Sequence, residues 1–146
     1  MFADLLKRLT TPATEPFPEP DAKLAMAALL VRIARSDGDY AEAEIARIDK
    51  ILATRHGLSP FEAAKMRGDA ETLESQAPDT VRFTRAIKDG VIYEERIEVI
   101  EALWGVVLAD GVRDPEENSL LRLTANLLGV NDRDSALARQ RVEAKS

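Results

Sequence analysis

The feature that most constrains the fold is a pair of segments that are apolar around almost the whole helix axis. Residues 24–35 and 97–108 carry apolar side chains at three- and four-residue spacing, and further apolar residues fill the positions between. A helix with this pattern has to be covered by other elements on most of its surface. Strand-like alternation is absent, and aromatic residues make up only 5% of the chain. We therefore predict an all-α domain with these two helices at its centre.

Other helices are expected to surround this pair, because further apolar-periodic segments are closed by Gly or Pro. Ser59 and Pro60 mark one helix start, with Ser as N-cap and Pro at the first helical position. Residues 68–78 have a weaker pattern and could hold a bend. The predicted helices cover residues 21–35, a segment ending near 56, a segment from 60, and residues 79–89, 94–109, 114–128 and 131–143.

The chain divides into a short leading part and one folded domain. Its 146 residues fit a single domain, which we place at residues 21–146. Residues 10–20 hold four of the seven prolines and are expected to form an extended tether. Residues 2–9 form a short amphipathic helix that is too short to be stable alone. We expect it to pack on its own domain or on a second copy, giving a homodimer; a partner protein or a membrane surface is the alternative.

An internal repeat links the two central helices. Residues 24–56 align with residues 97–129 at an offset of 73, so that Asp37-Gly38 meets Asp110-Gly111 and Glu44 meets Glu117. Each half reads as a buried helix, an Asp-Gly turn, an acidic helix start and an amphipathic helix ended by Gly. We predict two helical hairpins related by a pseudo-two-fold axis, in a compact domain of about seven to eight helices.

Composition excludes several classes of function. The chain has no Cys, which removes disulfides, thiolate metal sites and thiol nucleophiles, and it has a single His. The net charge of −6, from 26 acidic against 20 basic residues, argues against nucleic acid and favours cations or a basic protein surface. No apolar run of ~18 residues or secretory signal is present, so we expect no transmembrane segment and a cytoplasmic location.

Catalytic residues are not indicated. His56 stands before Gly57 at a helix end, where the helix dipole would favour the imidazolium. It has no Cys, plausible Ser or second His as a partner, and Trp104 is expected in the core. We predict that the protein is not an enzyme.

The two Asp-Gly turns are the candidate site. Carboxylates cluster in residues 37–44 and 110–117, with Arg113 the one cation among them. Oxygen-only ligands suit Ca²⁺ or Mg²⁺ better than a transition metal. The spacing is not that of an EF-hand, because Gly directly follows the first Asp and Glu comes seven residues later. The predicted metal ligands are Asp37, Asp39 and Glu44 in one half and Asp110, Asp114 and Glu117 in the other.

A simpler explanation covers part of this cluster. Asp114-Pro115-Glu116-Glu117 is a good capping box, and Asp39 with Glu42 offers the same in the first half. Capping does not account for Asp37 and Asp110, which end helices, where a carboxylate is disfavoured. An acidic surface that docks a protein partner of unknown identity is the third interpretation.

The segments "ARSDGDYAEAEIARIDKIL" and "ALWGVVLADGVRDPEENSLLRLTANLLGV", together with "FTRAIKDGVIYEERIEVIEALW", resemble the TerB family of tellurite-resistance proteins. They also resemble the N-terminal domains of some membrane-anchored DnaJ-like co-chaperones. The resemblance covers about residues 21–143. It implies a seven- to nine-helix domain whose acidic surface binds divalent cations, in a stress-response setting, with no established enzymatic activity. The alternative is a metal-free adaptor that docks a basic partner.

Deleting residues 1–20 tests the predicted division of the chain. If the leading helix docks outside this domain, the melting temperature of the shortened chain should be almost unchanged, because the tether has no pattern of a packed element. Circular dichroism melting of both forms measures this. A large drop would instead place Phe2, Leu5, Leu6 and Leu9 in the core of this domain.

Overall fold

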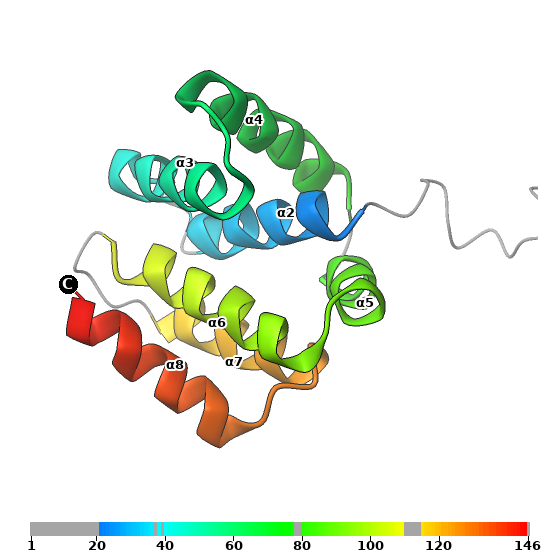
Figure 1. The fold of residues 1–146 in the computed structure, drawn as a ribbon, viewed down its shortest axis with the longest axis vertical. Coiled ribbons are helices and arrows are strands. Elements are labelled where there is room, and N and C mark those ends of the chain that lie inside the picture. Colours follow the sequence, from blue (N-terminus) through cyan, green and yellow to red (C-terminus); the bar gives the residue numbers. More distant parts are fainter. Residues whose placement is uncertain (1–20, 37, 39, 78–79, 110–114, 146) are drawn as a thin grey trace, which may run out of the picture.

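The structure, a computed structural model, describes residues 21–36, 38, 40–77, 80–109 and 115–145. Within these ranges the chain is entirely helical apart from turns and short connections, so the predicted all-α fold is confirmed (Figure 1). The predicted leading helix and tether lie outside the described residues. The helices are α2 (Ala22–Arg35), α3 (Glu42–His56), α4 (Pro60–Gln76), α5 (Val81–Gly90), α6 (Tyr93–Val107), α7 (Pro115–Leu127) and α8 (Asp132–Lys145).

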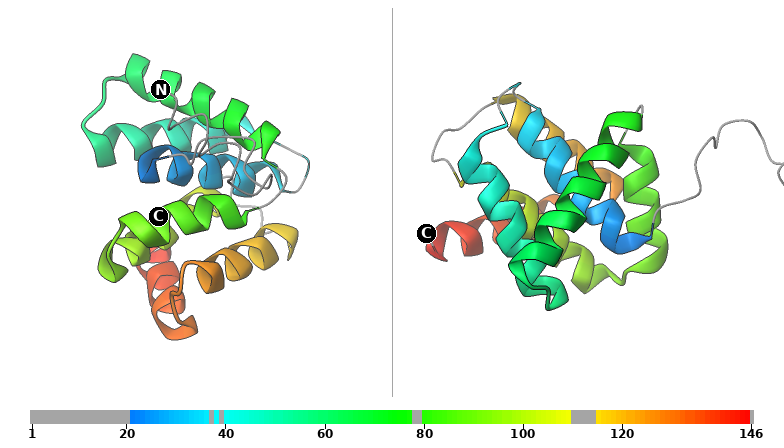
Figure 2. Two further views of the ribbon diagram at one scale, coloured as in Figure 1. Left: turned by 90° about the vertical axis from the view of Figure 1, so that its right-hand side faces the viewer. Right: turned by 90° about the horizontal axis from the view of Figure 1, so that it is seen from above.

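The helices form two groups of three with α5 beside them. Figure 1 shows α2, α3 and α4 above α6, α7 and α8, and the turned view in Figure 2 shows the same two groups as layers. Within the groups, α2 packs most extensively on α4 and α6 on α8, while α2 and α6 contact each other between the layers. The short helix α5 packs mainly on α2.

The centre of the core is the contact of α2 with α6. Leu30 and Ile33 on α2, and Leu103 and Val106 on α6, are completely buried, as the repeat predicts. Trp104 is also buried, with 8% of its surface exposed. Burying a Leu or Ile side chain fully contributes ~1.5–3 kcal/mol each, so these two helices supply much of the driving force for folding.

The internal repeat appears in the helix boundaries. Helix α3 begins at Glu42 and α7 at Pro115, which are 73 positions apart, the offset of the sequence repeat. Gly57 directly follows α3 and Gly129 closely follows α7, with φ angles of 64° and 74°. This left-handed backbone conformation is accessible to glycine at little cost, which explains the glycine at the end of each hairpin.

Helix α4 begins as predicted, with Ser59 as N-cap and Pro60 as the first helical residue. The Ser59 hydroxyl accepts a hydrogen bond from the Glu62 N–H at 3.1 Å, and Glu62 Oε1 accepts one from the Ser59 N–H at 3.0 Å. This is the reciprocal capping arrangement, and the hydrogen bonds from Ser59 lower the pKa of Glu62.

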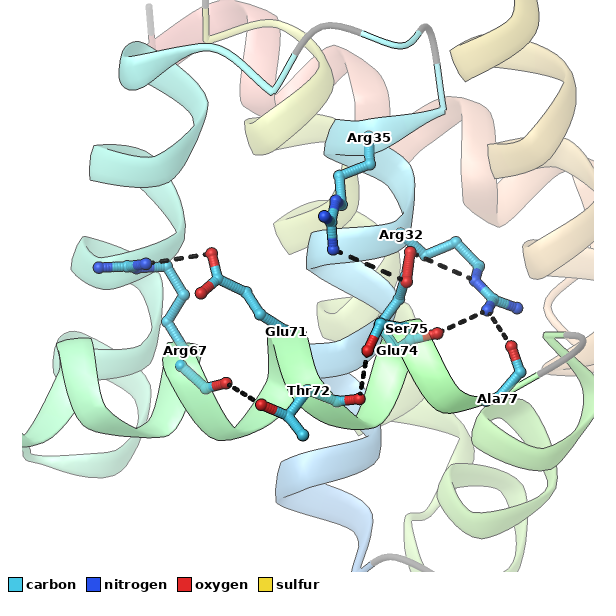
Figure 3. Close-up of polar contacts among 9 residues, drawn as sticks. Arg32, Arg35, Arg67, Glu71, Thr72, Glu74, Ser75 and Ala77 are labelled. Carbon is cyan, nitrogen blue, oxygen red and sulfur yellow. Dashed lines mark hydrogen bonds and ion pairs between the residues drawn. The ribbon is translucent and has the colours of Figure 1, made fainter.

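Residues 68–76, where the weaker pattern left a bend open, continue helix α4 without interruption to Gln76. Packing on both α2 and α3 holds it. Its last turn has no glycine; instead Arg32 of α2 donates to the carbonyl oxygens of Glu74 at 3.2 Å and Ala77 at 2.8 Å (Figure 3). A side chain from another helix therefore satisfies the carbonyls that a local cap would otherwise satisfy.

Among the described residues, none of the helices combines the length and the apolar character needed to cross a bilayer.

Leu103→Ala should lower the free energy of unfolding by ~2–5 kcal/mol, because it removes buried methyl groups and leaves a cavity between α2 and α6. Urea unfolding followed by circular dichroism measures the change. Leu123→Ala is the matched control, since half of the Leu123 side chain is exposed. Equal effects of the two substitutions would contradict the central role of the α2–α6 contact.

Candidate functional site

Of the six predicted metal ligands, the structure describes the side chain of Glu44. Glu117 belongs to helix α7, but its side chain lies outside the described residues. The other four also lie outside them: Asp37, Asp39, Asp110 and Asp114. That the six carboxylates come together in two sets of three therefore stays a prediction.

Glu44 is completely buried at the start of α3, where it is the third helical residue. Its Oε1 accepts a hydrogen bond from the backbone N–H of Ala41 at 3.3 Å. The helix thus begins at Glu42 with Ala41 as N-cap, and the predicted capping pair of Asp39 with Glu42 is wrong. The register is set by the buried face, because Glu44, Ile48 and Leu52 lie four residues apart and are all fully buried.

A buried carboxylate needs compensation. Removing a charged group from water is costly unless hydrogen bonds or positive charge replace the lost hydration. The Ala41 N–H and the positive end of the α3 dipole both favour the charge of Glu44. Its complete burial distinguishes it from Glu42, which also lies in the first turn of α3 but is exposed.

Two arginines lie in the last turn of α2, just before the first Asp-Gly turn (Figure 3). The Nη1 atom of Arg35 is 4.0 Å from Glu74 Oε2, and its guanidinium lies 5.4 Å from the centre of the Tyr40 ring. Positive charge at a helix C-terminus offsets the negative end of the dipole. The last turn of α6, before the second Asp-Gly turn, has no basic residue. The second turn therefore receives less positive charge from its own preceding helix than the first.

The described part of the chain holds no group of three or more His, Asp or Glu side chains that could bind a metal. Because only one of the six predicted ligands belongs to that part, the two turns are not tested by this result. A carboxylate such as that of Glu44, buried beside an Asp-Gly turn, fits the oxygen-only donor set that Ca²⁺ and Mg²⁺ prefer.

A second candidate site lies elsewhere, in a groove of about 880 Å³ formed by α2, α3 and α6 together with the turn between α5 and α6. We call it the interlayer groove. Met26, Ile51 and Val99 are among its apolar lining residues. Its positively charged lining residues are Lys23, Arg47, Lys50, Arg55 and Lys145. Two negatively charged residues, Glu95 and Glu98, also line it.

No local sequence pattern predicts the interlayer groove, because its walls come from segments far apart in the chain. The one local signal is the spacing of Arg47 and Lys50, which puts two cations on one face of α3.

His56, the last residue of α3, also lines the interlayer groove. Its Nε2 is shielded from solvent and has no hydrogen-bond partner in the described part of the chain. Burial lowers the pKa of His56, and the positive charges of Lys23 and Arg55 lower it further, against a weaker opposing effect of Asp21. The expectation of a favoured imidazolium is therefore wrong: burial and two cations outweigh the helix dipole.

The fold thus defines a class: all-helical domains made of two similar helical hairpins around a central helix pair. A family model described as tellurite resistance protein TerB matches residues 23–140. The chain belongs to the TerB family, which confirms the resemblance found in the Asp-Gly hairpins. No curated protein and no solved structure matches the chain significantly.

Acid should destabilise the wild type more steeply than His56→Gln. Because the folded-state pKa of His56 lies below its ordinary value of 6.5, the unfolded chain takes up a proton first as pH falls. The stability contributed by neutral His56 is complete above pH 6.5 and is lost as pH falls below it. Urea unfolding at pH 7.5, 6.5 and 5.5 gives the slope of the unfolding free energy against pH for each form. The carboxylates are the same in both forms, so the difference between the slopes reports on His56. Parallel slopes would contradict the lowered pKa.

Proposed function

We propose that this TerB-family chain is a non-enzymatic domain that binds a divalent cation, Ca²⁺ or Mg²⁺, at its acidic Asp-Gly turns. The observation that carries the proposal is the complete burial of the Glu44 carboxylate at the start of α3, seven residues after Asp37. Capping the N–H of Ala41 needs one oxygen of Glu44, and an exposed glutamate can do the same, as Glu62 does at the start of α4. Glu44 differs from Glu62 in being completely buried, so a carboxylate already withdrawn from bulk water stands at the start of α3.

The proposed ligands are Asp37, Asp39 and Glu44 in the first half, with Asp110, Asp114 and Glu117 in the second. A bound cation supplies positive charge and accepts carboxylate oxygens as ligands. Aspartates at the C-terminal ends of the central helices are unfavourable on their own, so a cation there would remove an electrostatic cost.

The proposed role is that of a cytoplasmic cation-responsive module in a stress-response or metal-sensing assembly. A ligand that binds only the folded state stabilises it in proportion to the logarithm of its concentration. Each turn joins a central helix to an outer helix of the same hairpin, so occupancy would act on the packing of α3 and α7. The family name supports the stress-response setting. A protein partner would respond to the changed packing of α3 and α7.

Calcium or magnesium at millimolar concentration should raise the melting temperature of chelator-treated protein. The gain is about 2.7 kcal/mol when the ion is at a hundredfold excess over its Kd. Differential scanning calorimetry measures the rise, and isothermal titration calorimetry measures binding directly. Asp37→Asn combined with Asp110→Asn should abolish both signals, and each single substitution should reduce them.

The matched control is Glu42→Gln, which removes the same charge from an exposed position in the first turn of α3. It should retain the ion-dependent rise, whereas Glu44→Gln should reduce it; the readout is the shift caused by the ion, whatever the starting stability. Identical melting with and without either ion would overturn the proposal. The metal-free adaptor that docks a basic partner through its acidic face would then be the better account.

A further inference from the structure

The interlayer groove runs along the central helices, from the N-terminal end of α2 to Ala102 on α6 and Arg47 on α3. It takes in Lys23 and Met26 from the first half of α2, and Glu95, Glu98 and Val99 from the first half of α6. Helix α2 has 14 residues, so its two ends are about 20 Å apart at a rise of 1.5 Å per residue. On α3, however, the groove reaches Arg47, three positions after the proposed cation ligand Glu44, so the two sites approach each other there to about one helical turn.

The charge of the groove is opposite to that of the whole chain. The net charge of the protein is −6, but the groove is lined by five Lys and Arg side chains and two Glu side chains. Glu98 is in an ion pair with Arg55, at 3.8 Å. Lys23, Arg47 and Lys50 form no ion pair with any of the described residues. A local excess of unpaired cations on an acidic protein would attract an anion.

Beneath these charges the groove is apolar. Met26 and Val99 belong to the buried core, and the half-buried Ile51 packs against that core. The volume of about 880 Å³ falls within the ~300–1,000 Å³ of pockets that bind small molecules. Apolar lining with a few charged groups at the edge is the usual composition of such pockets.

We infer that the interlayer groove binds a small amphiphilic anion, in which a carboxylate or phosphate head group contacts Arg47 and Lys50 and a short apolar chain covers Ile51. The cationic edge excludes a metal ion, and the acidic net charge of the chain excludes an extended nucleic acid. The volume of the groove favours a small molecule over an acidic protein helix. This inference does not depend on the proposed cation site.

Isothermal titration calorimetry of the full chain tests the inference with decanoate and decyl phosphate, which separate the two head groups. At least one of them should bind at one site per chain. Decyl maltoside has the same tail without the charge, and acetate and inorganic phosphate lack the tail; all three should bind at least tenfold more weakly. Equal binding of decyl maltoside would overturn the inference, because the cations would then contribute nothing.

Variants locate the site. Lys50→Glu should weaken binding of the anionic amphiphile at least tenfold, and Ala102→Leu should weaken it by filling the groove. Lys65→Glu is the matched control, because Lys65 is an exposed lysine of α4 outside the groove and should leave binding unchanged. Melting temperatures establish that each variant is folded. Equal effects of Lys50→Glu and Lys65→Glu on binding would overturn the location of the site. Binding of an acidic amphipathic peptide, without binding of either small anion, would overturn the proposed class of ligand.

Discussion

The structure depends on the packing of α2 against α6. Each of these helices is apolar on most of its surface, so each must be covered by the other and by further helices before it is stable in water. Helix α4 covers α2, and α8 covers α6, which gives the two layers seen in Figure 1. The positions of both candidate sites follow, because the Asp-Gly turns continue from the C-terminal ends of these helices and the interlayer groove runs along them between the two layers.

Periodicity and repetition predicted most of the fold because they record which faces are buried. The offset of 73 correctly pairs the starts of α3 and α7, and the glycines after both helices are needed for the left-handed backbone there. The start of α3 was predicted two residues too early, with Asp39 as the cap. Helix-start chemistry alone favoured the wrong register, because Asp39 is a far better N-cap than Ala41, which has no side-chain acceptor. Burial decided between them, by turning Glu44 inward with Ile48 and Leu52.

What the sequence could not predict depends on contacts between distant segments. Arg32 satisfies carbonyls at the end of α4 more than forty positions away, so nothing near Gln76 indicates how that helix ends. The pKa of His56 follows the same logic, because the local helix end favours a positive charge whereas burial and Lys23, which comes from another helix, oppose it. The interlayer groove likewise combines cations from α2, α3 and α8, which have no common pattern along the chain.

The two proposed sites place ligands of opposite charge on the same packed helices. A cation at the turns and an anion in the groove would each stabilise the folded chain by binding it in preference to the unfolded chain. Both sites belong to helices packed in one core, and Arg47 of the groove lies one helical turn from Glu44, so the two bound charges would attract each other directly. A larger coupling requires a second conformation that the two ligands favour to different extents. Sensing in the proposed assembly therefore requires either a partner that contacts a turn directly or a rearrangement of α2 against α6.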